Sequence, residues 1–221
     1  MNIPSIFPTT RTRFPSVLLD RITLADGRCV IVRPMVAIDA PAEQDFVRGL
    51  SMETRRKRFH VALQELSPDL LRQLTDVDHV GHVAIVAESL SNEDEGDDEA
   101  TIVADARYVS EHGETHLAIT VADAWQGVGL GRALLQRLLR YAARRGVERL
   151  VADMLRDNTA MARLAVACGG HLGPSPLERG LRRATFLFPR VSAPDPIPSS
   201  TLRIPSAPCR PTPASVSCGP R

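Results

Sequence analysis

The chain has 221 residues, of which 43% are hydrophobic and 24% are charged, a composition typical of a folded globular domain and too apolar for full disorder. Its formal net charge of +1 gives no global electrostatic reason to expect binding to nucleic acid or to an anionic membrane surface. No apolar run approaches the roughly 20 residues that a bilayer-spanning helix needs. The sequence therefore predicts neither a nucleic-acid nor a membrane partner.

The basic residues are almost all arginine, because Lys57 is the single lysine among the 27. A phosphate-binding loop of the GxxxxGK[ST] kind needs a lysine directly after a glycine-containing run, and Lys57 follows Arg55 and Arg56 instead. This excludes P-loop NTPases and the kinases that depend on such a loop.

The four cysteines form no CxxC pair, which favours a reducing cytoplasm over a disulfide-stapled fold or a structural zinc site. They are Cys29, Cys168, Cys209 and Cys218. His79 and His82 are three residues apart but have no third ligand nearby in the sequence, so we interpret them as a surface pair. We therefore expect a cytoplasmic protein without a metal.

Composition divides the chain into three parts. Residues 1–20 are predicted to be a loosely ordered leader, residues 21–188 carry the periodic patterns of a folded domain, and residues 189–221 contain nine of the 17 prolines. A segment so rich in proline and serine cannot bury enough apolar surface to offset its loss of conformational entropy. The last part is therefore predicted to be a disordered or polyproline-like tail.

Apolar periodicity, capping residues and glycine stops predict alternating strands and helices within residues 21–188. In chain order they are a strand (Cys29–Met35), three helices (Ile38–Gly49, Ser51–His60, Ser67–Asp76), three strands (Val80–Glu88, Ala100–Ser110, Thr115–Val121), a helix (Arg132–Arg145), a strand (Arg149–Leu155), a helix from Asp157 to Cys168, and a strand (Ala184–Phe188). This order predicts a mixed α/β fold in which helices flank a central mixed sheet of about six or seven strands.

The segment from Val121 to Arg132 reads VADAWQGVGLGR and joins a predicted strand to the strongest predicted helix. Its alternating glycines, Gly127, Gly129 and Gly131, let main-chain N–H groups converge without side-chain obstruction. The following helix adds its free N-terminal donors and the positive end of its dipole, so the turn suits a phosphate or diphosphate. The GxGxxG pattern of dinucleotide-binding folds does not fit, because its third glycine falls on Arg132.

The sequence resembles the GNAT superfamily of N-acetyltransferases, whose coenzyme A loop, (Arg/Gln)-x-x-Gly-x-(Gly/Ala), is matched by QGVGLG at 126–131. The downstream helix supports the match at that family's spacing, with Asp157, Asn158, Met161 and Leu164. More narrowly, LSMETRRKRF (50–59) and the strand and loop at 117–127 look like the branch of Pat-like protein-lysine acetyltransferases. The resemblance implies a GNAT-type acyl-CoA N-acyltransferase fold.

The resemblance also implies that acetyl-CoA is the co-substrate and that this region binds it. The loop amides would hold the diphosphate, the strand before the loop would pair its main chain with the pantetheine amides, and one N–H of that strand would polarise the thioester carbonyl. Asn158 would contact the pantetheine arm. The implied binding residues are Ile119, Thr120, Val121, Gln126, Gly127, Val128, Gly129, Leu130, Gly131, Arg132 and Asn158.

The catalytic residues depart from the family pattern. Pat-like relatives usually have a glutamate base where this chain has His116, and the tyrosine general acid of many family members is replaced by Ala165. A lysine-like acceptor amine is almost wholly protonated at pH 7, a handicap of roughly 4–5 kcal/mol, so a base is needed. We interpret His116 as the direct or water-mediated base, with Glu114 on the same strand face to orient or replace it. The alternative is that His116 is a polar residue without a chemical role.

The sequence thus predicts an acyltransferase that moves acetyl from acetyl-CoA to a primary amine by direct attack in a ternary complex. The acceptor is either a protein lysine or a small-molecule amine. A second hypothesis is a non-catalytic acetyl-CoA sensor, since both the usual glutamate and the usual tyrosine are absent. The four basic residues 55–58 either line the acceptor entrance or form a solvated helix face.

Overall fold

The computed structural model describes residues 18–61, 63–89 and 100–189. Most of the predicted leader (1–20) and nearly all of the predicted tail (189–221) lie outside these residues. The first described residue, Leu18, is buried, and the first strand begins at Asp20.

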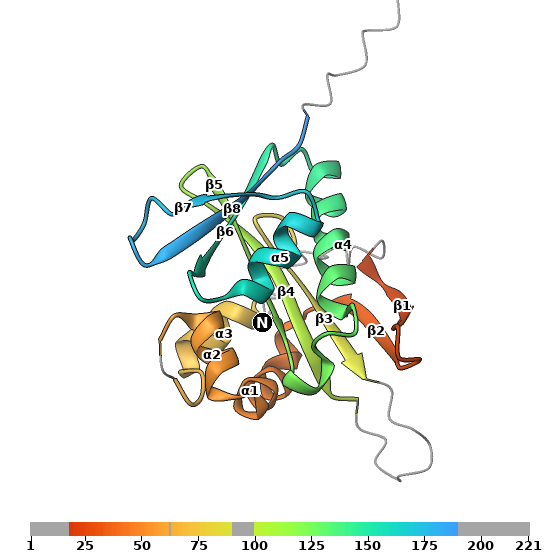
Figure 1. Ribbon diagram of the computed structural model, residues 1–221. Helices are drawn as coiled ribbons and strands as arrows, with labels where there is room; N and C mark the ends of the chain where they lie inside the picture. The colour runs from red at the N-terminus through yellow and green to blue at the C-terminus, as the bar shows by residue number, and fades with distance from the viewer. Residues whose placement is uncertain (1–17, 62, 90–99, 190–221) are drawn as a thin grey trace, which may run out of the picture. The chain divides into compact units, whose positions relative to one another are not determined.

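Within the described residues, eight strands form one sheet in the order β1-β2-β3-β4-β5-β6-β8-β7 (Figure 1). The strands are β1 (Asp20–Thr23), β2 (Cys29–Pro34), β3 (His82–Ser89), β4 (Ile102–Glu111), β5 (Glu114–Val121), β6 (Arg149–Leu155), β7 (His171–Pro174) and β8 (Leu181–Leu187). The helices are α1 (Ala40–Gly49), α2 (Met52–Phe59), α3 (Pro68–Thr75), α4 (Leu130–Arg144) and α5 (Thr159–Ala167), with 3-10 turns η2 (Ala37–Asp39) and η3 (Asp123–Trp125). The predicted mixed α/β fold is confirmed.

The expected count of six or seven strands is too low, because the sequence patterns missed β1 and β7. Each has four residues, and all of β7 and most of β1 are exposed to solvent. A strand with no buried face carries no apolar alternation, which is the signal that the prediction used. Both strands lie at the edges of the sheet.

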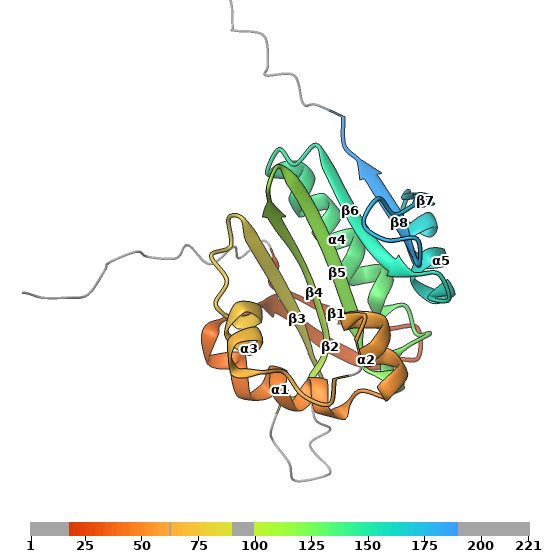
Figure 2. The ribbon, with the colours of Figure 1, turned by 90° about the vertical axis from the view of Figure 1, so that its left-hand side faces the viewer.

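The neighbouring strands β5 and β6 separate along most of their length. All other neighbouring strands pair antiparallel, whereas β5 and β6 are parallel and share one residue pair, His116 with Val151. Figure 2 shows the two strands diverging from that end. From Ala118 to Val121, β5 therefore has an unpaired main-chain edge on its β6 side. Such an edge can receive an extended ligand.

Helices cover both faces of the sheet (Figures 1 and 2). On one face α4 packs through Leu134 and Leu138, together with α5. On the other face α1 packs through Phe46 and Val47, together with α3. The basic helix α2 buries none of its own residues and lies beside β5 and β6. None of the helices in the described part of the chain combines the length and hydropathy of a membrane span.

Candidate active site

The predicted glycine turn joins β5 to α4 through η3. Gly127 and Gly129 have φ angles of +78° and +94°, in the left-handed region that glycine adopts without steric cost. No protein atom lies within 4 Å of a Cβ built on either glycine, so a side chain there would enter open space. Gly131 instead belongs to the first turn of α4, which begins two residues earlier than predicted, and its Cβ would touch Leu164 of α5 at 3.5 Å. Its small size allows α4 and α5 to approach.

The main-chain N–H groups from Gly127 to Arg132 donate to no acceptor within the described residues. The first N–H after them, that of Ala133, bonds the C=O of Gly129 at 3.1 Å and starts the hydrogen-bond ladder of α4. Six consecutive free donors thus meet at the N-terminus of a 15-residue helix. Such a place binds anions through its donors and its helix dipole.

Four of these six residues, Gly127, Gly129, Gly131 and Arg132, line a cavity of about 490 Å³ whose walls come from α2, β5, the loop and α5. The lining residues are Thr54, Lys57, Arg58, Ile119, Thr120, Val121, Gln126, Gly127, Gly129, Gly131, Arg132, Asn158, Ala160, Met161, Arg163 and Leu164. Four of them are lysine or arginine, and none is aspartate or glutamate. The electrostatics of the cavity therefore favour an anionic ligand.

The cavity brings together nine of the eleven residues that the resemblance implied for coenzyme binding. The other two lie behind it: Leu130 is buried in the core, and Val128 packs against the core while its C=O accepts the N–H of Ala25 at 3.5 Å. Asn158 caps α5, because its Oδ1 accepts the N–H of Met161 at 3.1 Å. Of the four basic residues 55–58 in α2, Lys57 and Arg58 line the cavity and Arg55 and Arg56 do not.

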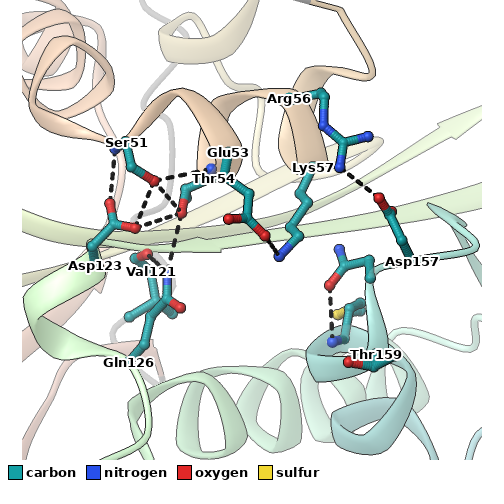
Figure 3. Close-up of polar contacts among 12 residues, drawn as sticks. Ser51, Glu53, Thr54, Arg56, Lys57, Val121, Asp123, Gln126, Asp157 and Thr159 are labelled. Atoms are coloured by element: carbon teal, nitrogen blue, oxygen red, sulfur yellow. Dashed lines mark hydrogen bonds and ion pairs between the residues drawn. The ribbon is translucent and has the colours of Figure 1, made fainter.

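The helix α2 is bonded to the coenzyme-loop side of the cavity through Asp123 (Figure 3). Its carboxylate accepts the N–H of Ser51 at 2.8 Å and the hydroxyl of Thr54 at 2.7 Å. Gln126 completes the link by donating its Nε2–H to Thr54 at 3.3 Å and to the C=O of Val121 at 3.0 Å. Burial raises the pKa of Asp123, but the bonds from Ser51 and Thr54 outweigh it and leave the pKa below its ordinary value. Sequence reasoning missed Asp123, since its partners are about 70 residues away.

The same helix is bonded to α5 on the opposite side of the cavity (Figure 3). Arg56 donates to Asp157, directly before the cap of α5, with an N–O distance of 2.6 Å. Lys57 forms an ion pair with Glu53 one turn earlier in α2. The helix α2 therefore bridges the glycine loop and α5, and presents Thr54, Lys57 and Arg58 to the cavity between them.

The predicted base, His116, lies where β5 and β6 separate, at their one shared residue pair. Its Nε2 is 3.3 Å from Oε2 of Glu114, the predicted partner, and 41% of its side chain is exposed. Neither residue lines the cavity, whose β5 wall begins at Ile119, and both are partly buried. Ala165, at the usual tyrosine position, is fully buried in the core.

A cluster of buried ionisable side chains lies next to Arg58. Arg107 contacts Asp105 at 2.8 Å and Glu43 at 3.4 Å, and Arg58 lies 3.9 Å from Asp105. Burial, together with the negative charge of Asp105, raises the pKa of Glu43 to about 8. This cluster could not be predicted from local patterns, because its members come from three separate elements.

The interpretation of His79 and His82 as a surface pair is wrong. His79 is buried and His82 is only partly exposed, because Asp78 accepts the N–H groups of Val80 and His82 at 2.8 Å and closes a tight turn there. Burial and the nearby Arg107 lower the pKa of His82 to about 4. Within the described residues, no group of three histidine, cysteine or acidic side chains is placed to hold a metal ion.

Comparison with known proteins identifies the family. The model of the acetyltransferase (GNAT) family matches residues 54–169, which include most of α2, the glycine loop and α5. Acetyltransferase PA5475 of Pseudomonas aeruginosa is 38% identical over 149 residues, covering 66% of this chain and 77% of its own length. The chain belongs to the acetyltransferase (GNAT) family.

Relatives called Pat are also similar to the chain. Acetyltransferase Pat of Mycolicibacterium smegmatis is 31% identical over 147 residues, which cover 65% of this chain but only 41% of that protein. Among solved structures, the GNAT domain of S. lividans PAT superposes with a TM-score of 0.70 at 26% identity, covering 79% of this chain and 99% of that domain. The predicted GNAT fold and the Pat-like resemblance are confirmed.

Membership of this family makes the protein an acyltransferase, as the sequence predicted. It supports the enzyme hypothesis over the alternative of a non-catalytic acetyl-CoA sensor. The structure of yncA from Salmonella typhimurium, solved with acetyl-CoA, has a similar fold, with a TM-score of 0.55 at 21% identity.

Proposed function

We propose that this protein is an N-acetyltransferase that transfers the acetyl group of acetyl-CoA to a primary amine, on a protein lysine or on a small molecule. The observation that carries the proposal is the row of six unpaired N–H donors from Gly127 to Arg132, four of whose residues line a cavity with four basic side chains. Two positive-φ glycines leave room there for a diphosphate. Relatives named acetyltransferase, and yncA with acetyl-CoA as its cofactor, support the same donor.

The residues present fit the parts of acetyl-CoA. The loop amides and Arg132 receive the diphosphate, and the unpaired edge of β5 from Ile119 to Val121 receives the pantetheine amides. Asn158, already engaged as a cap through Oδ1, offers its amide group from the α5 side. A main-chain N–H of β5 polarises the thioester carbonyl and stabilises the oxyanion that forms on attack.

In this proposal His116 removes the proton that the attacking amine loses. If Nε2–H donates to Glu114, Nδ1 carries the lone pair and takes the proton directly or through one water. The amine nitrogen bonds to the carbonyl carbon, the carbon–sulfur bond breaks, and coenzyme A leaves as a thiolate that solvent protonates. A tyrosine acid is not required for this departure, which accords with Ala165 in the core.

A cytoplasmic location is part of the proposal. It is supported by the two described cysteines, Cys29 and Cys168, which are both free thiols, as in proteins of reducing compartments.

The test compares His116→Ala with His171→Ala, which removes an exposed imidazole from β7. At saturating acetyl-CoA, His116→Ala should lower the rate of thiol release with an amine or peptide acceptor by about 10²–10³-fold, the scale of a lost general base. The dissociation constant of acetyl-CoA from calorimetry should stay within twofold, and His171→Ala should behave as the unchanged protein. An unchanged rate in His116→Ala would remove His116 from the mechanism, and no binding of acetyl-CoA would refute the whole proposal.

A further inference from the structure

A buried arginine outside the coenzyme cavity connects two carboxylates that belong to different strands. Arg183 of β8 is 5% exposed. It donates to both oxygens of Asp153 on β6, from Nε at 2.9 Å and from Nη2 at 2.7 Å. Its remaining nitrogen, Nη1, donates to Oε1 of Glu114 on β5 at 2.8 Å. All three nitrogens of the guanidinium are therefore used.

Glu114 connects Arg183 to His116, the proposed base. Its Oε1 holds Arg183 and also lies 3.1 Å from Nη2 of the half-exposed Arg149, while Oε2 faces Nε2 of His116 at 3.3 Å. The contacts form one chain from Asp153 through Arg183 and Glu114 to His116.

These side-chain contacts cross the junction of β5 and β6, which the main chain joins through a single ladder pair. Strands β5 and β6 share one residue pair, His116 with Val151, so the ladder between them holds His116 but has no further pair at Glu114. Arg183 pairs directly with Asp153 in the β6–β8 ladder, and its side chain reaches over β6 to β5. The side chain of Arg183 thus adds a second connection to β5, next to the single ladder pair at His116.

We propose that Arg183 is a positioning residue: by holding Glu114, it keeps the imidazole of His116 in the orientation that leaves Nδ1 free to take the proton of the acceptor amine. The inference rests on the proposed role of His116 as the base. Asp153 takes part by fixing the guanidinium from the other side.

The chemistry of the bridge needs arginine. A planar guanidinium can bond one carboxylate with two parallel N–H groups and a second carboxylate with a third nitrogen, whereas an ammonium is a single point charge. Burial raises the pKa of Asp153, but its bonds with Arg183 and then Ser175 outweigh this effect and leave it below its ordinary value. Asp153 is thus an ionised anchor rather than a second base.

The experiment is a double-mutant cycle between Arg183→Met and His116→Ala, read as kcat at saturating acetyl-CoA and acceptor. Arg183→Met alone should lower kcat about 10–100-fold, with acetyl-CoA affinity within twofold. In the His116→Ala background the same change should cost less than twofold, because the group that it positions is already gone. Arg183→Lys should recover little activity. The matched control is Arg182→Met, since the neighbouring Arg182 points to the other sheet face and makes no ion pair with a described residue.

Losses that multiply would show that Arg183 acts independently of His116 and would overturn the inference, while leaving His116 as the base. An unaffected His116→Ala enzyme would overturn both. If Arg183→Met fails to fold, Glu114→Gln interrupts the same chain with a side chain of equal size. It should also reduce kcat in a way that depends on His116, and a loss independent of His116 would refute the inference.

Discussion

The two halves of the proposed active site are constructed differently. The coenzyme half consists of main-chain N–H groups from one continuous loop, exposed by two positive-φ glycines and the start of α4. The acceptor half consists of side chains from β5, β6 and β8, held by ion pairs around Arg183, together with α2, which lies beside β5 and β6. A main-chain site depends on local backbone geometry, whereas a side-chain site depends on the packing of distant elements. Substitutions should therefore affect the two halves separately.

The largest effect is expected in the coenzyme half, from Gly129→Val. A β-branched residue at a φ of +94° is strained, and its side chain would enter the open space in which we place the diphosphate. We expect the dissociation constant of acetyl-CoA, measured by calorimetry, to rise 100-fold or more.

The control for this change is Gly146→Val, at the far end of α4, where φ is +77° and a Cβ also meets open space. It should cause a similar loss of stability without a change in acetyl-CoA affinity. Equal effects of the two variants on acetyl-CoA affinity would mean that Gly129 matters for folding alone. That result would contradict a separate coenzyme half built on this loop.

An intermediate effect is expected where the two halves join, at Asp123. Asp123→Asn replaces the carboxylate that bonds Ser51 and Thr54 of α2. Hydrogen bonds to a charged group are each worth about 1.5–3 kcal/mol, so α2 should lose its fixed position beside the cavity. We expect the KM of the acceptor to rise about 10-fold, with a smaller change in acetyl-CoA affinity. Asp69→Asn, at an exposed ion pair of α3, is the control, and an unchanged acceptor KM would contradict a role for α2 in the acceptor half.

The smallest effect is expected on stability, from Glu43→Gln beneath Arg58. Burial raises the pKa of Glu43 from its ordinary 4.5 to about 8, so the folded state holds a proton that the unfolded state releases between these values. The free energy of unfolding therefore falls as pH rises from about 4.5 to 8. The variant should flatten this dependence and have a melting temperature a few degrees above that of the unchanged protein at pH 9. If the melting temperatures of the variant and of the unchanged protein changed equally between pH 6 and pH 9, the raised pKa of Glu43 would be contradicted.

The same contrast explains how much could be predicted from the sequence. The helices, the six longer strands and the glycine loop were predicted because each has a periodic or local signal. The edge strands β1 and β7 have no such signal, and the turn around Asp78 that buries His79 depends on packing. Local reasoning also placed Gly131 in the exposed turn, although the structure assigns it to the contact between α4 and α5.

In the acceptor half, the sequence indicated His116 and Glu114 but not their supports. The pairing of Arg183 with Glu114 joins residues 69 positions apart, and that of Arg183 with Asp153 joins residues 30 apart. Such contacts follow from strand order, in particular from β8 lying between β6 and β7, which no local pattern determines.

A crystal structure of this protein with coenzyme A tests the central claim most directly. We predict diphosphate oxygens within about 2.7–3.2 Å of main-chain nitrogens between Gly127 and Arg132, with the pantetheine arm between β5 and β6 and its thiol near His116. A diphosphate bound elsewhere, with those nitrogens contacting only solvent, would contradict the account.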